Sequence, residues 1–217
     1  MNRRIFIVVC IVVFVVGFAA LHPIQKPKAP QDKRYVKLTN KGEQIPSWSG
    51  PWRCVLDKKT GLVWEMKSCD ESIHDGQSTF SWYDGKIGVK NSGGCFVGDE
   101  YCDNTDIITI SNKQNMCGIS SWRLPTAKEL KTLIKKDARP GEPLINTSYF
   151  PYTKRGPYWT SDANKTLFGI HKRYKEGAVA ISFIDAKEET LPYNTTCFVR
   201  VVAKYKFTHT QAPKTVK

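Results

Sequence analysis

The chain has 217 residues, of which 41% are hydrophobic, 12% aromatic and 24% charged. This composition supplies enough apolar side chains for a packed core and excludes a chain that is disordered throughout. Because 33 Lys and Arg outnumber 20 Asp and Glu, the formal net charge is +13, which favours anionic partners without identifying any of them.

The first 21 residues have the pattern of an export signal. Arg3 and Arg4 precede Ile5–Leu21, seventeen residues without a charge. That length exceeds the roughly 7 to 15 apolar residues of a cleaved signal peptide and approaches the ~17 to 25 of a membrane-spanning helix. We therefore expect a membrane anchor through residues 5–21, while the small residues Gly17 and Ala19 leave cleavage and secretion open. The arginine pair should stay in the cytoplasm and place the later residues outside it, which argues against an intracellular nucleic-acid partner.

Composition divides the remaining chain into a linker, one domain and a tail. Residues 22–34 are rich in proline and basic side chains, which is typical of an extended, semi-rigid linker. Residues 208–217 are polar and basic without periodicity, and we interpret them as a tail. One folded domain, at about 35–207, is then expected.

Six cysteines follow Cys10 in the sequence, and in an exported domain an even number predicts disulfides. Their pairing stays open, although a Cys54–Cys197 bridge would close a long loop and stabilise the fold most. No C-x-x-C spacing occurs and the four histidines are scattered, so neither a zinc site nor any other metal or cofactor is expected. The disulfide candidates are Cys54, Cys69, Cys95, Cys102, Cys117 and Cys197.

An acidic stretch from Asp99 to Asp106 raises the question of calcium. Its carboxylates could supply oxygen ligands, but the alternating pattern of a calcium loop is absent. A solvated loop held by Cys95 and Cys102 is the favoured interpretation, and calcium binding there stays open.

The expected elements are several short strands and one convincing helix. A turn at Asp57–Gly61 between apolar residues predicts a hairpin over residues 52–65. Thr126 with Glu129 three residues later predicts a capped main helix near 126–138, ended by Pro140 and Gly141. Further strands are expected at 107–110, 158–160, 167–170, 178–184 and 198–203. These elements predict an α+β domain with an antiparallel sheet.

Five sequence blocks carry a resemblance to a known family. They resemble the Lcl C-terminal domain family, named for the terminal domain of a bacterial collagen-like adhesin, over about residues 35–204. The block around Trp122–Thr126 is also similar to a segment of formylglycine-generating enzymes and other C-type-lectin-like folds, which implies a mixed fold of that kind. The five blocks are Cys54–Glu65, Cys117–Leu130, Ile145–Pro151, Tyr158–Ser161 and Phe198–Val201.

The resemblance implies a role in adhesion to sulfated polysaccharides. It also implies a bacterial source, so the exported part would face the periplasm from an inner-membrane anchor, or be secreted after cleavage. This chain lacks the collagen-like stalk that would trimerise such an adhesin, so multivalent adhesion is not expected of it.

The excess positive charge lies in the second half of the domain. Arg34–Ala127 holds eleven basic and eleven acidic residues, whereas Lys128–Lys217 holds seventeen basic and eight acidic. Clusters of cations beside aromatic side chains suit sulfated or phosphorylated polymers, although a merely solubilising surface would look the same. Tyr158 and Tyr174 are candidates for stacking on a sugar ring. The candidate polyanion-binding residues are Lys131, Lys135, Lys136, Arg139, Lys154, Arg155, Lys172, Arg173 and Lys175.

Two classes of function stay open from the sequence. The first is a non-enzymatic binding module of the cell envelope that holds an anionic glycan; the second is an accessory domain that docks to another envelope protein. No catalytic residue is predicted, because Asp57, Glu65 and Glu129 show no spacing typical of an acid/base pair. Trp64, Trp122 and Trp159 are expected in the core, Arg123 in a structural ion pair and Glu129 in a helix cap.

Overall fold

The computed structural model describes residues 33–97 and 102–205. The described residues all belong to one compact unit, which contains every described strand, helix, disulfide and core cluster. The proposed anchor, residues 22–32 of the proposed linker, residues 99–101 of the acidic stretch and the basic tail lie outside the described residues. Within the described ranges, no helix combines the length and hydrophobicity that a bilayer span requires.

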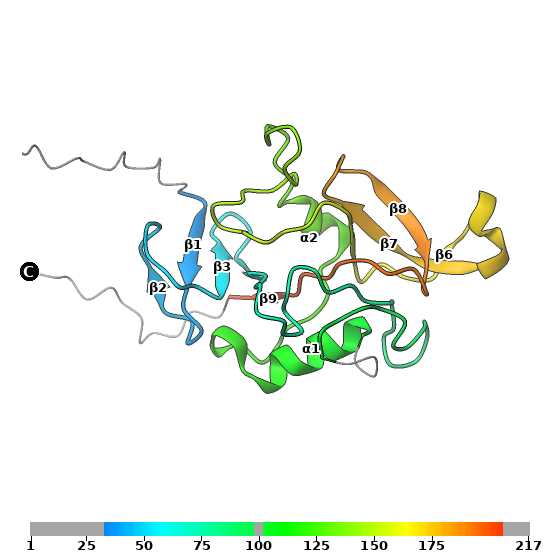
Figure 1. The fold of residues 1–217 in the computed structure, drawn as a ribbon, viewed down its shortest axis with the longest axis horizontal. Helices are drawn as coiled ribbons and strands as arrows, with labels where there is room; N and C mark the ends of the chain where they lie inside the picture. Colours follow the sequence, from blue (N-terminus) through cyan, green and yellow to red (C-terminus); the bar gives the residue numbers. More distant parts are fainter. Residues whose placement is uncertain (1–32, 98–101, 206–217) are drawn as a thin grey trace, which may run out of the picture. The chain divides into compact units, whose positions relative to one another are not determined.

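The first sheet contains five antiparallel strands in the order β2-β1-β3-β4-β9 (Figure 1). The hairpin predicted around Asp57–Gly61 is confirmed, because β3 and β4 pair with Cys54 opposite Glu65, and Gly61 has the positive φ of 69° that its turn requires. The strand bounds are Tyr35–Leu38 for β1, Gln44–Ile45 for β2, Cys54–Asp57 for β3, Leu62–Glu65 for β4 and Val202–Lys204 for β9.

The second sheet is built around β7, Glu176–Ser182, which the sequence predicted closely as 178–184. The short strands β5 and β6 pair with one edge of β7, and β8 pairs with the other. All of these pairs are antiparallel, so the predicted α+β class with antiparallel sheets is confirmed. The bounds are Pro157–Trp159 for β5, Lys165–Thr166 for β6 and Glu188–Pro192 for β8.

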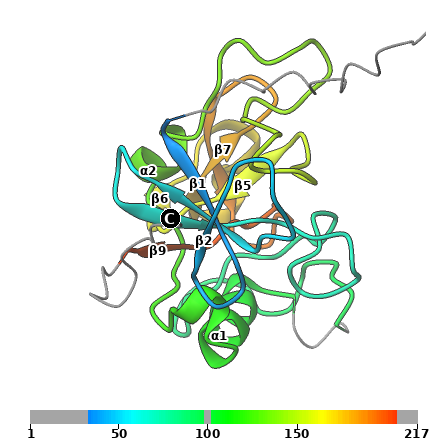
Figure 2. The same cartoon turned by 90° about the vertical axis from the view of Figure 1, so that its left-hand side faces the viewer.

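Alternate side chains of the central strands enter two separate core clusters. Val63 and Leu56 belong to one cluster, whereas Trp64 and Val55 belong to the other. Because a strand directs successive side chains to opposite faces, both faces of these strands are buried. Figure 2 shows α1 and α2 at different places around the sheets. The predicted core positions of Trp64, Trp122 and Trp159 are confirmed.

The prediction of one main helix near 126–138 is wrong in length. Thr126 and Glu129 do form the predicted capping box, but α2 spans only Ala127–Lys131. The Thr132 hydroxyl bonds back to the Glu129 carbonyl at 2.7 Å, and the Thr132 carbonyl accepts a hydrogen bond from Arg34 at 2.8 Å. These bonds replace the ones that would continue the helix.

The longest helix among the described residues is α1, Asn104–Lys113, where the sequence predicted a short strand at 107–110. Its β-branched residues favour a strand, but Asp103 and Asp106 form a complete capping box that starts a helix. Ile107 and Ser111, four residues apart, face the core. The strand predicted at 167–170 is also wrong: Gly169, with φ +58°, opens a 3₁₀ turn over Gly169–Tyr174.

Two disulfides form, which confirms a disulfide-stapled fold but not the expected use of all six cysteines. Cys54 pairs with Cys117 and not with Cys197, and Cys95 pairs with Cys102 as expected for the acidic loop. Cys69 is free and exposed, and Cys197 is free and buried. Burial raises the pKa of the Cys197 thiol, which disfavours the reactive thiolate.

Candidate functional site

An exposed basic cluster lies at the end of the β6–β7 hairpin, in residues Phe168–Lys175, here called the tip. Lys165 of β6 pairs with Gly177 of β7, and the Leu167 amide donates to the Lys175 carbonyl at 2.8 Å. Gly177 lets β8 approach, because a Cβ there would lie 2.1 Å from the Leu191 carbonyl oxygen. The hairpin therefore holds the tip on the second sheet, where Figure 1 shows it beyond the end of β6.

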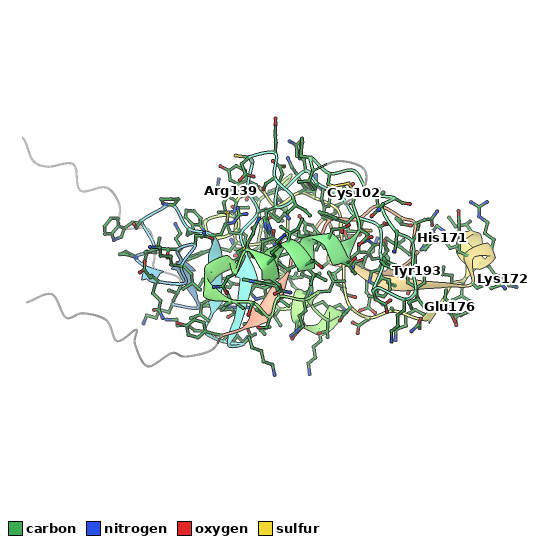
Figure 3. The ribbon with its side chains drawn as sticks, turned by 90° about the horizontal axis from the view of Figure 1, so that it is seen from below. Cys102, Arg139, His171, Lys172, Glu176 and Tyr193 are labelled. Atoms are coloured by element: carbon green, nitrogen blue, oxygen red, sulfur yellow. A yellow bond between two sulfur atoms is a disulfide. The ribbon has the colours of Figure 1, made fainter. Side chains whose placement is uncertain are left out.

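Three of the predicted polyanion-binding residues, Lys172, Arg173 and Lys175, lie together in the tip and are exposed. The tip contains no carboxylate, and among the described residues no Asp or Glu oxygen forms a salt bridge with any of these three side chains. Their positive charges are therefore available to a ligand. Figure 3 shows Lys172 at the outer end of the hairpin, and Glu176, the first residue of β7, closer to the strands.

Tyr174 lies beside this charge and retains the predicted capacity for stacking. It is 40% exposed, its ring centroid is 4.8 Å from the Arg173 guanidinium carbon, and its hydroxyl accepts a hydrogen bond from Arg173 at 2.8 Å. That hydrogen bond lowers the pKa of Tyr174. Arg173 and Tyr174 thus present a cation and an aromatic ring side by side.

Tyr158, the other stacking candidate, is not available to a ligand. Only 1% of it is exposed, since β5 places it inside the core. Its ring packs edge-on against Phe183 at 4.8 Å between centroids, and its hydroxyl accepts a hydrogen bond from the Lys154 amide at 3.0 Å. The prediction failed because an aromatic residue beside a basic pair does not reveal which face of its strand is buried.

The basic residues at the end of α2 and after it form a second cluster, Lys131, Lys135, Lys136 and Arg139, which is partly neutralised. Lys131 pairs with Glu188 at 2.6 Å, Lys135 with Asp137 at 3.9 Å and Arg139 with Glu142 at 3.9 Å. Figure 3 shows Arg139 well separated from Lys172 along the horizontal direction. Arg139 and the tip therefore lie at different places on the molecule.

Lys154 and Arg155 make up the remaining predicted pair, in the loop that precedes β5. Both are exposed, and no salt bridge to either is formed by the part of the chain that the structure describes. They are available to a polyanion as a second, smaller point of contact.

A solvent-open groove of about 780 Å³ lies next to Lys165, at the base of the hairpin. Its lining includes Trp82, Asp84, Arg123 and Asp162. Arg123 is engaged with Glu129 at 2.7 Å, which confirms its predicted structural ion pair, and Asp162 accepts a hydrogen bond from the Ala127 amide at 2.7 Å. The lining contains no histidine or cysteine.

The described part of the acidic stretch serves the fold. The Asp103 side chain caps the Thr105 amide at 2.8 Å, and the Asp106 carboxylate accepts from the Asp103 amide at 3.1 Å. Across residues 33–97 and 102–205, no group of three or more His, Cys, Asp or Glu side chains has the arrangement of a metal site. Asp99 and Glu100, which complete the proposed calcium ligands, lie outside the described residues.

A buried ionic cluster lies in the interior, centred on Glu65. Its carboxylate accepts hydrogen bonds from Lys67 at 3.1 Å, from His74 at 2.7 Å and from the Val201 amide at 3.1 Å. Arg200, also fully buried, donates to the Glu65 carbonyl and to Thr153. The four ionisable side chains, Glu65, Lys67, His74 and Arg200, are at most 2% exposed, so the cluster acts on the fold and not on a ligand.

Comparison with known proteins gives one match. Residues 53–203 match the family model described as the Lcl C-terminal domain, which spans well over half of the chain. No curated protein and no solved structure matches.

Proposed function

The chain belongs to the Lcl C-terminal domain family, and on that premise we propose that it is a non-enzymatic module of the cell envelope that binds an anionic, sulfated polysaccharide. The tip is the main contact, and Lys154 and Arg155 are a second one. The observation that carries the proposal is the group of three exposed cations, Lys172, Arg173 and Lys175, without a carboxylate partner among the described residues.

The chemistry of the tip supports a sulfated polymer. Sulfate groups repeat along such a chain, so several modest ion pairs form together, and each weakens as salt screens it. Tyr174 adds an aromatic ring next to Arg173, and an aromatic face can pack on the apolar face of a sugar ring. The exposed position of the hairpin end lets a long polymer pass without entering a closed pocket.

The proposal includes a fold and a location. We place the domain among C-type-lectin-like folds, on the basis of the Trp122–Thr126 block together with the mixed antiparallel architecture. Residues 5–21 are proposed as an inner-membrane anchor that leaves the domain in the periplasm, or as a signal whose cleavage releases it.

Heparin chromatography tests the proposal on the full chain in a nonionic detergent. The wild type should bind heparin resin and elute with rising salt, and K172E/R173E/K175E should lose about tenfold or more in affinity. The matched control is K41E/K58E/K59E, which reverses three exposed lysines outside the tip. The proposal would be contradicted if the wild type did not bind heparin, if its binding did not depend on salt, or if both variants lost the same heparin affinity. Such a result would favour docking to another envelope protein.

A further inference from the structure

The tip carries two exposed apolar side chains that binding of a sulfated glycan does not explain. Phe168 is 77% exposed and Ile170 is 87% exposed. An isoleucine has neither a hydrogen-bonding group nor an aromatic face to offer a sugar ring. Large apolar groups exposed close together are a recognised sign of an interaction surface.

The backbone directs these two side chains outward in a defined turn. Gly169, between them, has φ +58°, and the His171 amide donates to the Phe168 carbonyl at 3.2 Å. The preceding Leu167 is only 2% exposed and fixes the chain to the second sheet. Phe168 and Ile170 are therefore held at the end of a supported hairpin, and no described part of the chain packs over them to bury them.

Cations lie immediately after the apolar pair. Lys172, Arg173 and Lys175 follow within five residues of Ile170, and the first carboxylate is Glu176, directly after Lys175 where β7 begins. Apolar side chains beside several cations form the pattern that binds the surface of an anionic bilayer: the apolar groups enter the boundary between headgroups and acyl chains, and the cations contact phosphates. Two apolar side chains alone are too few for the roughly 800 Å² that each partner of a standard protein–protein interface buries.

We propose that the tip inserts Phe168 and Ile170 into the interfacial layer of an anionic lipid membrane, while Lys172, Arg173 and Lys175 bind its phosphate groups. This function goes beyond glycan binding, because it depends on two apolar side chains that the glycan proposal does not use. The two ligands share the three cations, so they would compete for the tip.

Vesicle co-sedimentation tests this inference with the 32–217 unit, which contains every described element and lacks the apolar segment 5–21. The wild type should bind vesicles of phosphatidylcholine mixed with phosphatidylglycerol and bind phosphatidylcholine alone at least tenfold less. F168S/I170S, which keeps every charge, should bind the mixed vesicles about tenfold less than the wild type. The matched control is W48S, because Trp48 is 83% exposed and lies in the loop after β2, outside the tip.

The same variants separate this inference from the proposed function. F168S/I170S should keep its elution from heparin, whereas K172E/R173E/K175E should lose both heparin and vesicle binding. The membrane inference would be overturned if the wild type did not bind the mixed vesicles, or if F168S/I170S and W48S lost equal amounts of vesicle binding. In either case the heparin result alone would decide the glycan proposal. Near-ultraviolet circular dichroism of each protein checks that the fold is retained.

Discussion

Glu65 is the residue whose replacement should cost the fold most. It is fully buried and provides the carboxylate that faces Lys67 and His74. Removing one partner of a buried ion pair leaves the others charged and desolvated, which typically costs about 3 to 5 kcal/mol. We expect E65Q to lower the free energy of unfolding by about 3 kcal/mol in urea denaturation at neutral pH. E71Q is the control, since Glu71 is exposed, and a loss in E65Q no larger than in E71Q would contradict this role.

The difference in unfolding free energy between the wild type and E65Q should also depend on pH. Burial alone would raise the pKa of Glu65, but the positive charge of Lys67 and the hydrogen bond from His74 outweigh it and lower the pKa to about 2. Because this value lies below the ordinary 4.5, the stabilisation is complete above pH 4.5 and is lost as the pH falls towards 2. The difference in unfolding free energy between wild type and E65Q should therefore narrow between about pH 5 and pH 2, and a constant difference would argue against an ionised Glu65.

Single residues were predictable where local chemistry decides their role. Thr126 and Glu129 form the expected cap, and Arg123 forms the expected ion pair, because each depends on neighbours a few positions away. Tyr158 was not predictable, since its burial depends on which face of β5 is covered. Phe168 was assigned to a strand, whereas Gly169 opens a 3₁₀ turn directly after it and leaves Phe168 in the exposed tip.

At the scale of elements, the two disulfides join segments at very different separations. Cys54 of β3 is linked to Cys117 across 63 positions, whereas Cys95 and Cys102 are only 7 apart. In the loop-entropy model the Cys54–Cys117 bridge stabilises the fold by about 4 kcal/mol and the Cys95–Cys102 bridge by about 2.5 kcal/mol. C54A/C117A should therefore lose more unfolding free energy in urea than C95A/C102A. A smaller loss in C54A/C117A would show that native-state effects outweigh loop closure.

Element identity followed from the sequence where pattern and tertiary context agree. The β3–β4 hairpin combines two apolar runs with a glycine turn, and β7 is a long apolar segment, so both were predicted. For α1, helix capping by Asp103 and Asp106 competes with the strand preference of Ile107, Ile108 and Ile110, and the cap prevails. The length of α2 depends on Arg34, nearly one hundred residues away, which no local pattern contains.

At the scale of the whole molecule, the excess of positive charge in the second half is distributed over separate places. The sequence indicated the excess correctly but not its arrangement, because ion pairs such as Lys131–Glu188 join residues 57 positions apart. The cluster after α2 is largely paired with carboxylates, whereas the tip is not. The capacity to bind a polyanion should therefore differ between the two clusters.

Neutralising equal numbers of charges in the two clusters tests this difference. K131Q/K135Q/R139Q and K172Q/R173Q/K175Q each remove three positive charges, so both variants lower the net charge of the chain equally. A difference in the salt concentration that elutes them from heparin then reports the position of the charges and not their number.

We expect the tip variant to elute at clearly lower salt than the wild type, with an affinity for heparin that is about tenfold lower. The variant after α2 should change about twofold or less, because each of its cations already has a carboxylate within 4.0 Å. Equal shifts in both variants would mean that heparin responds to net charge alone and that the tip is not a distinct site.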